Sequence, residues 1–234
     1  MAQQSSKRYK KALGLVDSTK SYPLKGAVEI MAKFPRAKFN ETVDVAFRLG
    51  VDPKQSDQMV RGTVSLPHGS GKVVRVLVFA KSGGSAEAAK AAGAEYVGYD
   101  DLIKKCQEGW ADFDVAIATP EAMIEVRKLG KILGPRGLMP NPKTGTVTED
   151  TAKAVKEVKA GRVEFKTDKA GNVHVSAGKA SFTPVQIEEN VRSIIDTVTK
   201  ARPSSVKGTY VHSCTISTTM SPAVRVDMRE FVTH

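Results

Sequence analysis

The sequence of 234 residues predicts an α/β protein of two domains. One is a discontinuous α+β outer domain with a mostly antiparallel sheet, and the other is an inserted, doubly wound α/β domain with a parallel sheet. Segments near both ends of the chain alternate apolar and polar residues, as strands with one face in solvent do. Segments in the middle are almost wholly apolar and are separated by helical stretches, which is typical of strands covered on both faces.

The two chain ends supply the elements of the outer domain. Ser21-Tyr22-Pro23 begins a helix that runs through Lys33. Residues 42–49 alternate along their whole length and predict the first strand of the sheet. The C-terminal part shows the same alternation. It predicts a strand at 162–166, a turn at 169–172, and strands at 173–175, 210–216 and 224–227.

A long helix is expected after Thr183. Thr183-Pro184-Val185-Gln186 combines an N-cap, a proline at the first helical position and a reciprocal capping box. The apolar residues that follow fall on one stripe, which predicts packing against the outer sheet: Ile187, Val191, Ile194, Ile195 and Val198.

The middle of the chain alternates strands with helices. The expected order is strand 73–80, helix 86–92, strand 96–98, helix 101–107, strand 115–118 and helix 120–128. For the last helix, Thr119 supplies a cap and Pro120 the first helical position. This order predicts a doubly wound unit.

The domain boundaries are expected where glycine interrupts the pattern. The crossings are Pro67-His68-Gly69-Ser70-Gly71 and Ala160-Gly161, so the outer domain is residues 1–66 with 161–234 and the inserted domain is 67–160. Glycine allows backbone angles to change with little strain, so we expect a hinge here.

The charge is strongly basic and unevenly distributed. Lys and Arg number 36 and Asp and Glu 25, a formal net charge of +11. Residues 67–160 hold 14 basic and 12 acidic residues, which leaves 22 and 13, a net of +9, for the two ends. Such a field favours a polyphosphate partner, and the outer domain carries most of it. A solvated basic surface is the alternative.

Several classes of protein are disfavoured. No run approaches the ~18 apolar residues of a membrane span, and residues 1–11 do not form a secretory signal. Cys106 and Cys214 lack paired spacing, which argues for a reducing, cytosolic compartment and against a zinc site. The four histidines form no local catalytic or metal-binding signature. We therefore expect no catalytic residues, no metal and no cofactor.

Two glycine-containing segments were weighed as nucleotide sites. Gly69-Ser70-Gly71-Lys72 fails the phosphate-loop pattern, because no glycine lies five positions before Gly71 and Val73 follows Lys72. Lys81-Ser82-Gly83-Gly84-Ser85 joins a strand to a helix, where a phosphate can bind, but it lacks the Gly-x-Gly-x-x-Gly order. A serine-capped turn is the simpler interpretation of the second segment.

Two further segments point to RNA contact. Arg36-Ala37-Lys38-Phe39-Asn40-Glu41-Thr42 places an aromatic ring among basic and amide groups at a strand entrance, although Phe39 could also be a core residue at the sheet edge. Along 212–222, alternation puts Ser213, Thr215 and Ser217 on one face and Cys214 and Ile216 on the other. Hydroxyls in a row can bind phosphates and the 2′-hydroxyl of RNA, and a merely solvated face is the alternative.

The segment from Lys131 to Val147, KILGPRGLMPNPKTGTV, closely resembles the signature of bacterial members of the large-subunit ribosomal protein L1 family. Further resemblance lies in 38–43, 49–53, 60–69 and the Thr219-Met220 turn, so it covers essentially the whole chain. The signature reads as a Gly/Pro-rich loop in the inserted domain. Its characteristic residues are Lys131, Gly134, Arg136, Gly137, Met139, Pro140, Lys143 and Gly145.

The resemblance implies a structural, non-enzymatic protein of the large ribosomal subunit in the cytoplasm. It implies a Rossmann-like inserted domain, an outer domain that binds rRNA at the junction of the mobile stalk, assistance in the release of deacylated exit-site tRNA, and repression of the protein's own operon mRNA. No membrane and no small-molecule substrate are implied.

Matching motifs imply particular rRNA-binding residues. They are Lys38, Phe39 and Thr42, then Ser213, Thr219, Met220 and Ser221, with Lys166 and His174 expected on the same sheet face. Ser221 stands where the family usually has glycine, which raises the question of whether that position needs a positive φ.

Two other functions remain as alternatives. An α/β enzyme with a nucleotide at 82–85 would be stabilised against heat by ATP or NAD, whereas an rRNA-binding protein would be stabilised by an rRNA fragment. A general basic RNA chaperone would show little preference among folded RNAs.

Overall fold

A computed structural model describes residues 6–55, 57–81 and 83–231, and its chain forms two compact units. Unit 1 is the chain up to Gly71 and from Val163 onward, and unit 2 is Lys72–Arg162. The boundaries therefore lie at 71/72 and 162/163, five and two residues after the predicted boundaries at 66/67 and 160/161. The mixed α/β class, with one antiparallel and one parallel sheet, is confirmed.

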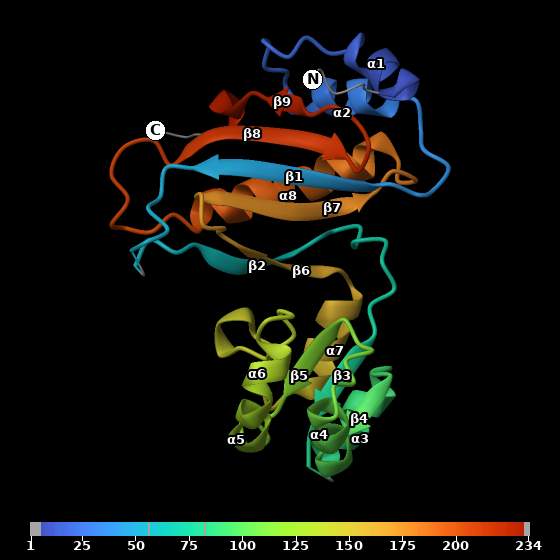
Figure 1. Ribbon diagram of the computed structural model, residues 1–234, viewed down its shortest axis with the longest axis vertical. Coiled ribbons are helices and arrows are strands. Elements are labelled where there is room, and N and C mark those ends of the chain that lie inside the picture. Colours follow the sequence, from blue (N-terminus) through green and yellow to red (C-terminus); the bar gives the residue numbers. More distant parts are fainter. Residues whose placement is uncertain (1–5, 56, 82, 232–234) are drawn as a thin grey trace. The chain divides into compact units, whose positions relative to one another are not determined.

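The main sheet of unit 1 has four strands in the order β7-β1-β8-β9 (Figure 1). They are β1 (Thr42–Leu49), β7 (Asn172–Lys179), β8 (Val211–Thr218) and β9 (Val224–Val226), and every pairing is antiparallel. The observed bounds of β1 are those that its alternation predicts. The central strand β1 comes from the N-terminal part of the chain and its neighbours from the C-terminal part, so the two parts share one sheet.

Helices cover one face of this sheet. They are α1 (Lys7–Leu13), α2 (Leu24–Ala32) and α8 (Pro184–Lys200), with a short 3-10 helix, η3 (Met228–Glu230), near the C-terminus. The capping box at Thr183 is formed, and the predicted stripe of α8 is wholly buried. The side chains of Val43, Val45 and Phe47 pack against α2 and α8 in one core. The opposite face of the sheet is not covered by these helices and carries the polar alternates.

A second, two-stranded sheet in unit 1 consists of β2 (Arg61–Ser65) and β6 (Arg162–Lys166), whose first residue is the last of unit 2. β6 and β7 flank the predicted turn, yet they belong to different sheets and share only a bridge between Thr167 and Val173. The expectation that Lys166 shares the sheet face of His174 is therefore wrong. The Thr167 hydroxyl donates to Val60 O at 2.7 Å, which directs this part of the chain to the β2 side.

Unit 2 contains a parallel sheet in the order β4-β3-β5. Its strands are β3 (Val76–Phe79), β4 (Tyr96–Gly98) and β5 (Val115–Ala118), and its longer helices are α3 (Gly84–Ala91), α4 (Asp100–Gln107) and α7 (Thr151–Lys159). All four residues of β3 are buried. Alternate residues of β3 enter two separate clusters, with Leu77 and Phe79 in one and Val76 and Val78 in the other. The all-apolar strand pattern is explained by this two-sided burial.

The helix predicted over 120–128 is wrong in its bounds. Residues 120–122 form a turn, followed by α5 (Met123–Val126), a 3-10 segment η1 (Arg127–Leu129) and α6 (Gly130–Leu133). Thr119 still caps the segment, since its Oγ1 accepts from Ala122 N at 3.3 Å. Buried residues run on to Leu133. The apolar stripe therefore continues beyond the predicted helix, and the first residues of the signature segment lie in α6.

Polar contacts fix the chain where it leaves unit 1. Asn190, fully buried on α8, accepts from His68 N at 3.1 Å and donates to Gly69 O at 3.1 Å and to Ala177 O at 2.8 Å. A buried amide needs such partners. These contacts hold 68–69 on unit 1, which is why the boundary falls after Gly71 and not at residue 66.

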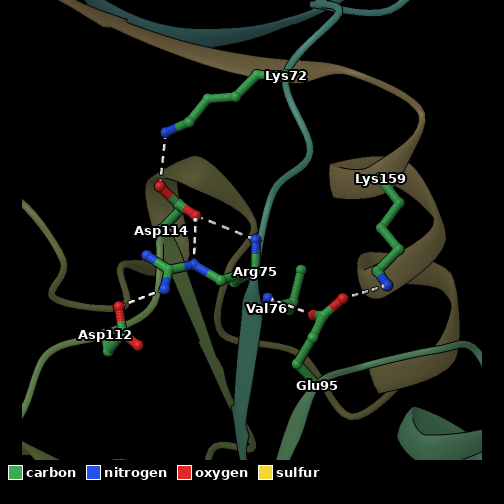
Figure 2. Close-up of polar contacts among 7 residues, drawn as sticks. All are labelled: Lys72, Arg75, Val76, Glu95, Asp112, Asp114 and Lys159. Carbon is green, nitrogen blue, oxygen red and sulfur yellow. Dashed lines mark hydrogen bonds and ion pairs between the residues drawn. The ribbon is translucent and has the colours of Figure 1, made fainter.

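A cluster of charged groups fixes the chain where unit 2 begins (Figure 2). Asp114 accepts from Lys72 Nζ at 2.5 Å and from Arg75 N at 3.1 Å, and these bonds lower the pKa of its carboxyl. Nearby, Glu95 accepts from Val76 N at 2.7 Å and from Lys159 Nζ at 2.7 Å. The start of β3 is thereby bonded to the residue before β5 and, through Glu95, to the end of α7.

Candidate nucleic-acid interface

The two segments that the sequence predicts to contact RNA meet at one end of the sheet in unit 1. Thr42 N donates to Thr219 Oγ1 at 3.0 Å, and Thr219 N donates to Thr42 O at 3.0 Å. Reciprocal bonds between positions 177 residues apart place 38–42 beside 218–221. The arrangement combines a basic, an aromatic, a thioether and several hydroxyl side chains on one surface.

Two apolar side chains of this surface are exposed. Phe39 is 54% exposed and Met220 is 51% exposed, so the interpretation of Phe39 as an edge core residue is wrong. Lys38 beside Phe39 is also exposed. Exposed aromatic and thioether groups next to a cation can pack on sugars and bases while the cation neutralises phosphate.

A buried carboxylate that the sequence analysis did not single out supports these segments. Glu41 is 4% exposed and accepts from Thr218 Oγ1 at 2.6 Å and from Arg8 at 3.2 Å. Lys179 Nζ donates to Thr42 Oγ1 at 2.9 Å, which links β7 to the same corner. The place of Glu41 one residue before the alternating strand is the sequence signal that could have identified it, whereas its burial is seen only in the structure.

Ser221 fits this corner without strain. No non-glycine residue in the described part of the chain has a positive φ, so the backbone at Ser221 is in an ordinary region. The Ser221 hydroxyl accepts from Thr218 N at 2.9 Å and lies 3.1 Å from Pro222 O, to which it donates. A side chain at this position therefore closes the turn after β8 instead of distorting it.

From this corner, rows of polar side chains cross the uncovered sheet face. The register pairs Ser176 and Ser217 with Asp44, and His174 and Thr215 with Ala46. Burial follows the predicted alternation of β8, with Cys214 and Ile216 buried and the hydroxyl residues half-buried. His174 is exposed. The sheet thus presents hydroxyl, imidazole and carboxylate groups in register.

Asp44 is the acidic residue in the middle of these rows. Partial burial raises the pKa of its carboxyl, although His174 and Lys179 act in the opposite direction. A carboxylate here opposes the binding of an anion. The centre of the face is therefore less favourable for a phosphate than it would be without Asp44.

Two of the remaining predicted residues lie away from this corner within unit 1, and the signature residues lie in unit 2. Ser213 stands opposite Arg48 at the far end of β8, and Lys166 is exposed at the end of β6 in the other sheet. The signature residues all belong to unit 2: Lys131 on α6, Gly134, Arg136 and Gly137 in an exposed turn, partly buried Met139, buried Pro140, and Lys143 and Gly145 at or after the 3-10 helix η2 (Pro142–Thr144).

The segment that was weighed as a nucleotide site, residues 81–85, is poorly suited to bind a phosphate. Ser82 lies outside the described residues, and the hollow at this end of β3 and β5, about 370 Å³, is lined by Lys81 together with Glu121 and Glu149. Two carboxylates disfavour an anionic ligand. Within the described residues, no group of three or more His, Cys, Asp or Glu could hold a metal ion, and no helix is long and apolar enough to cross a membrane.

The fold and the surface together fit a class of protein, namely RNA-binding modules, with the open side of an antiparallel sheet as the candidate contact face. A scan against protein-family models matches residues 31–222 to the ribosomal protein L1p/L10e family. This chain belongs to the ribosomal protein L1 family. It is a structural, rRNA-binding protein of the large ribosomal subunit in the cytoplasm and not an enzyme.

Proposed function

We propose that the corner formed by Lys38, Phe39, Thr42, Thr219 and Met220 is the principal rRNA contact, and that it binds a folded junction of the mobile stalk. The observation that carries the proposal is the reciprocal bonding of Thr42 and Thr219, which joins the two predicted segments. Hydroxyl and backbone contacts recognise the shape of the RNA, while the two exposed apolar side chains pack on sugars or bases. Ser213, Ser221 and His174 extend the contact along the face.

Phe39→Ala tests this site in the full chain. Loss of a stacked or packed aromatic costs about 1–3 kcal/mol, or roughly 5- to 150-fold in Kd for a stalk rRNA fragment. Val185→Ala is the matched control, because Val185 is also an exposed apolar residue of unit 1 but lies on α8. Equal affinities of both variants and the wild type in a filter-binding assay would remove this site assignment.

Thr219→Ser and Thr219→Ala separate the hydroxyl from the rest of the side chain. Thr219 Oγ1 accepts from Thr42 N, so the alanine variant loses the bond that holds the corner together, whereas the serine variant keeps it. We expect Thr219→Ser to bind near wild-type strength. The alanine variant should bind the stalk rRNA fragment more weakly than the wild type, by a factor similar to that of Phe39→Ala.

We also propose that this surface binds the mRNA of the protein's own operon and that this binding represses its translation. An mRNA site that mimics the rRNA junction would occupy the same residues, so the two RNAs must compete. The test is displacement of a labelled stalk fragment by an mRNA leader fragment. If both RNAs bind at once, the shared site is wrong.

Unit 2 is proposed to contact deacylated tRNA at the exit site and to assist its release. Support comes from exposed cations of the signature segment, Lys131 and Arg136, which suit weak phosphate contacts. Lys131→Gln with Arg136→Gln should slow tRNA release from ribosomes while leaving stalk-fragment affinity unchanged. Unaltered release kinetics would refute this role.

A further inference from the structure

A second basic site lies on unit 1 at the end of the sheet away from Phe39. An open groove of about 790 Å³ is lined by Arg48 from β1, His212 and Ser213 from β8, Arg225 from β9 and Arg229 from η3. The sequence analysis names Ser213 of this lining but none of the three arginines, which come from three separate elements. We propose that this arginine groove binds phosphates of the RNA strand that lies along β8.

The cations of the arginine groove are available for a ligand. Arg48, Arg225 and Arg229 are exposed, and none forms an ion pair with any other residue in the described ranges. The one carboxylate in the lining, Asp227, accepts from Arg229 N at 3.0 Å. Three arginines around one concavity repel one another in the absence of an anion, so a phosphate lowers that cost.

The sheet register places Arg48 and Arg225 on the side of the sheet that the proposed rRNA contact uses. Arg48 pairs with Ser213, and Arg225 pairs with Thr215, both on the polar face of β8. Because residues two apart in a strand share a face, Ser213, Thr215 and Ser217 form a continuous hydroxyl track from the groove to Thr219. Six residues of strand span on the order of 20 Å. Groove and corner therefore contact different phosphates of one RNA.

The backbone at Gly50 packs tightly against two residues that line the groove on the β8 side. Gly50 N donates to Tyr210 O at 2.7 Å, and a Cβ on Gly50 would lie 2.3 Å from Thr209 O and 2.9 Å from His212 Nε2. Only glycine tolerates that approach. The close packing holds Thr209 and His212 at the margin of the groove.

The inference rests on the proposed rRNA function, and its test distinguishes the two. The test is Arg48→Gln with Arg225→Gln in the full chain, binding the stalk rRNA fragment between 50 and 200 mM salt. Each lost phosphate contact reduces the steepness of log affinity against log salt by roughly 0.7–0.9. The slope of the double variant should therefore be less steep than that of the wild type by about 1.4–1.8. The variant should bind about tenfold or more weakly at 50 mM, and the gap should narrow towards 200 mM.

Lys25→Gln with Lys200→Gln is the matched control. It removes the same charge from exposed positions on α2 and α8, which cover the other face of the sheet, and should leave the slope unchanged. Circular dichroism checks that the variants are folded.

Two outcomes overturn the inference. If the arginine variant keeps the wild-type slope while Phe39→Ala weakens binding, the groove is not a phosphate site and the proposed function stands. If neither changes binding, both fail.

Discussion

Thr218→Val tests whether the buried Glu41 carboxylate holds the RNA-binding corner together. The substitution keeps the shape of the side chain and removes the hydroxyl that donates to Glu41 Oε2 at 2.6 Å. Glu41 then retains the bond from Arg8 at 3.2 Å, in a site where its residue is 4% exposed. The variant leaves one carboxylate oxygen buried without its donor.

The magnitude follows from two opposing effects. A hydrogen bond to a charged group contributes about 1.5–3 kcal/mol, and the buried acceptor has no water to replace it. A new buried methyl group contributes about 0.8 kcal/mol in the other direction. The net expectation is a loss of about 1–2 kcal/mol from the unfolding free energy of unit 1.

The assay follows the Cys214 thiol, which lies on the same strand as Thr218 and is fully buried. Its labelling is measured in increasing urea by peptide-level mass spectrometry. Thr215→Val is the control, since it makes the same change on β8 at a half-buried position. The Thr215 hydroxyl has no hydrogen-bond partner among the described residues, so this substitution should shift the unfolding free energy by no more than about 0.5 kcal/mol. Equal losses in the two variants would refute the reasoning.

One further substitution and one labelling experiment test the physical description. Burial raises the pKa of Asp44, so its contribution to stability falls as pH rises from the ordinary value near 3.8 through the folded pKa. Asp44→Asn should therefore stabilise the protein at pH 7 and not at pH 3, as measured by urea unfolding, and should strengthen rRNA binding. Burial also raises the pKa of the Cys106 thiol, and that of Cys214 to about 12. Each unit holds one of these cysteines, so both should resist thiol reagents in the folded chain and become reactive at separate urea midpoints.

Local patterns allowed some elements to be predicted closely. The alternation of residues 42–49 recurs as β1 with the same ends, and the capping box at Thr183 begins α8 as expected. Both signals act over a few residues and do not depend on which other elements pack nearby. The bounds of the helix after Pro120 depended on packing, since burial of Leu129 and Leu133 extends the helical segment beyond its local signals.

Strand partners and the convergence of the site could not be predicted in this way. Lys166 and His174 are eight residues apart, yet they lie in different sheets because β6 pairs with β2 and β7 with β1. Composition gave no preference between a buried and an exposed Phe39, and only the folded chain decides. The arginine groove could not be predicted either, because Arg48 and Arg225 are brought together only by the strand order β1-β8-β9.

The segment that most resembles the family is not the one that forms the proposed rRNA face, and its hydrogen bonds give a reason. Asn141 O accepts from Thr144 N at 3.2 Å and from Thr146 N at 3.3 Å, while Asn141 N donates to Thr146 Oγ1 at 2.8 Å.

This turn positions the next residues for bonding to β5. Ala118 N donates to Thr146 O at 2.9 Å, and Thr148 N donates to Ala118 O at 3.1 Å. Val147 thereby forms a parallel bridge with Ala118 beside β5. The backbone hydrogen bonds of these residues are part of the fold of unit 2, so the segment is characteristic of the family's fold. The proposed recognition on unit 1 instead uses side chains on an open sheet face, where residues from several strands can supply the same chemistry.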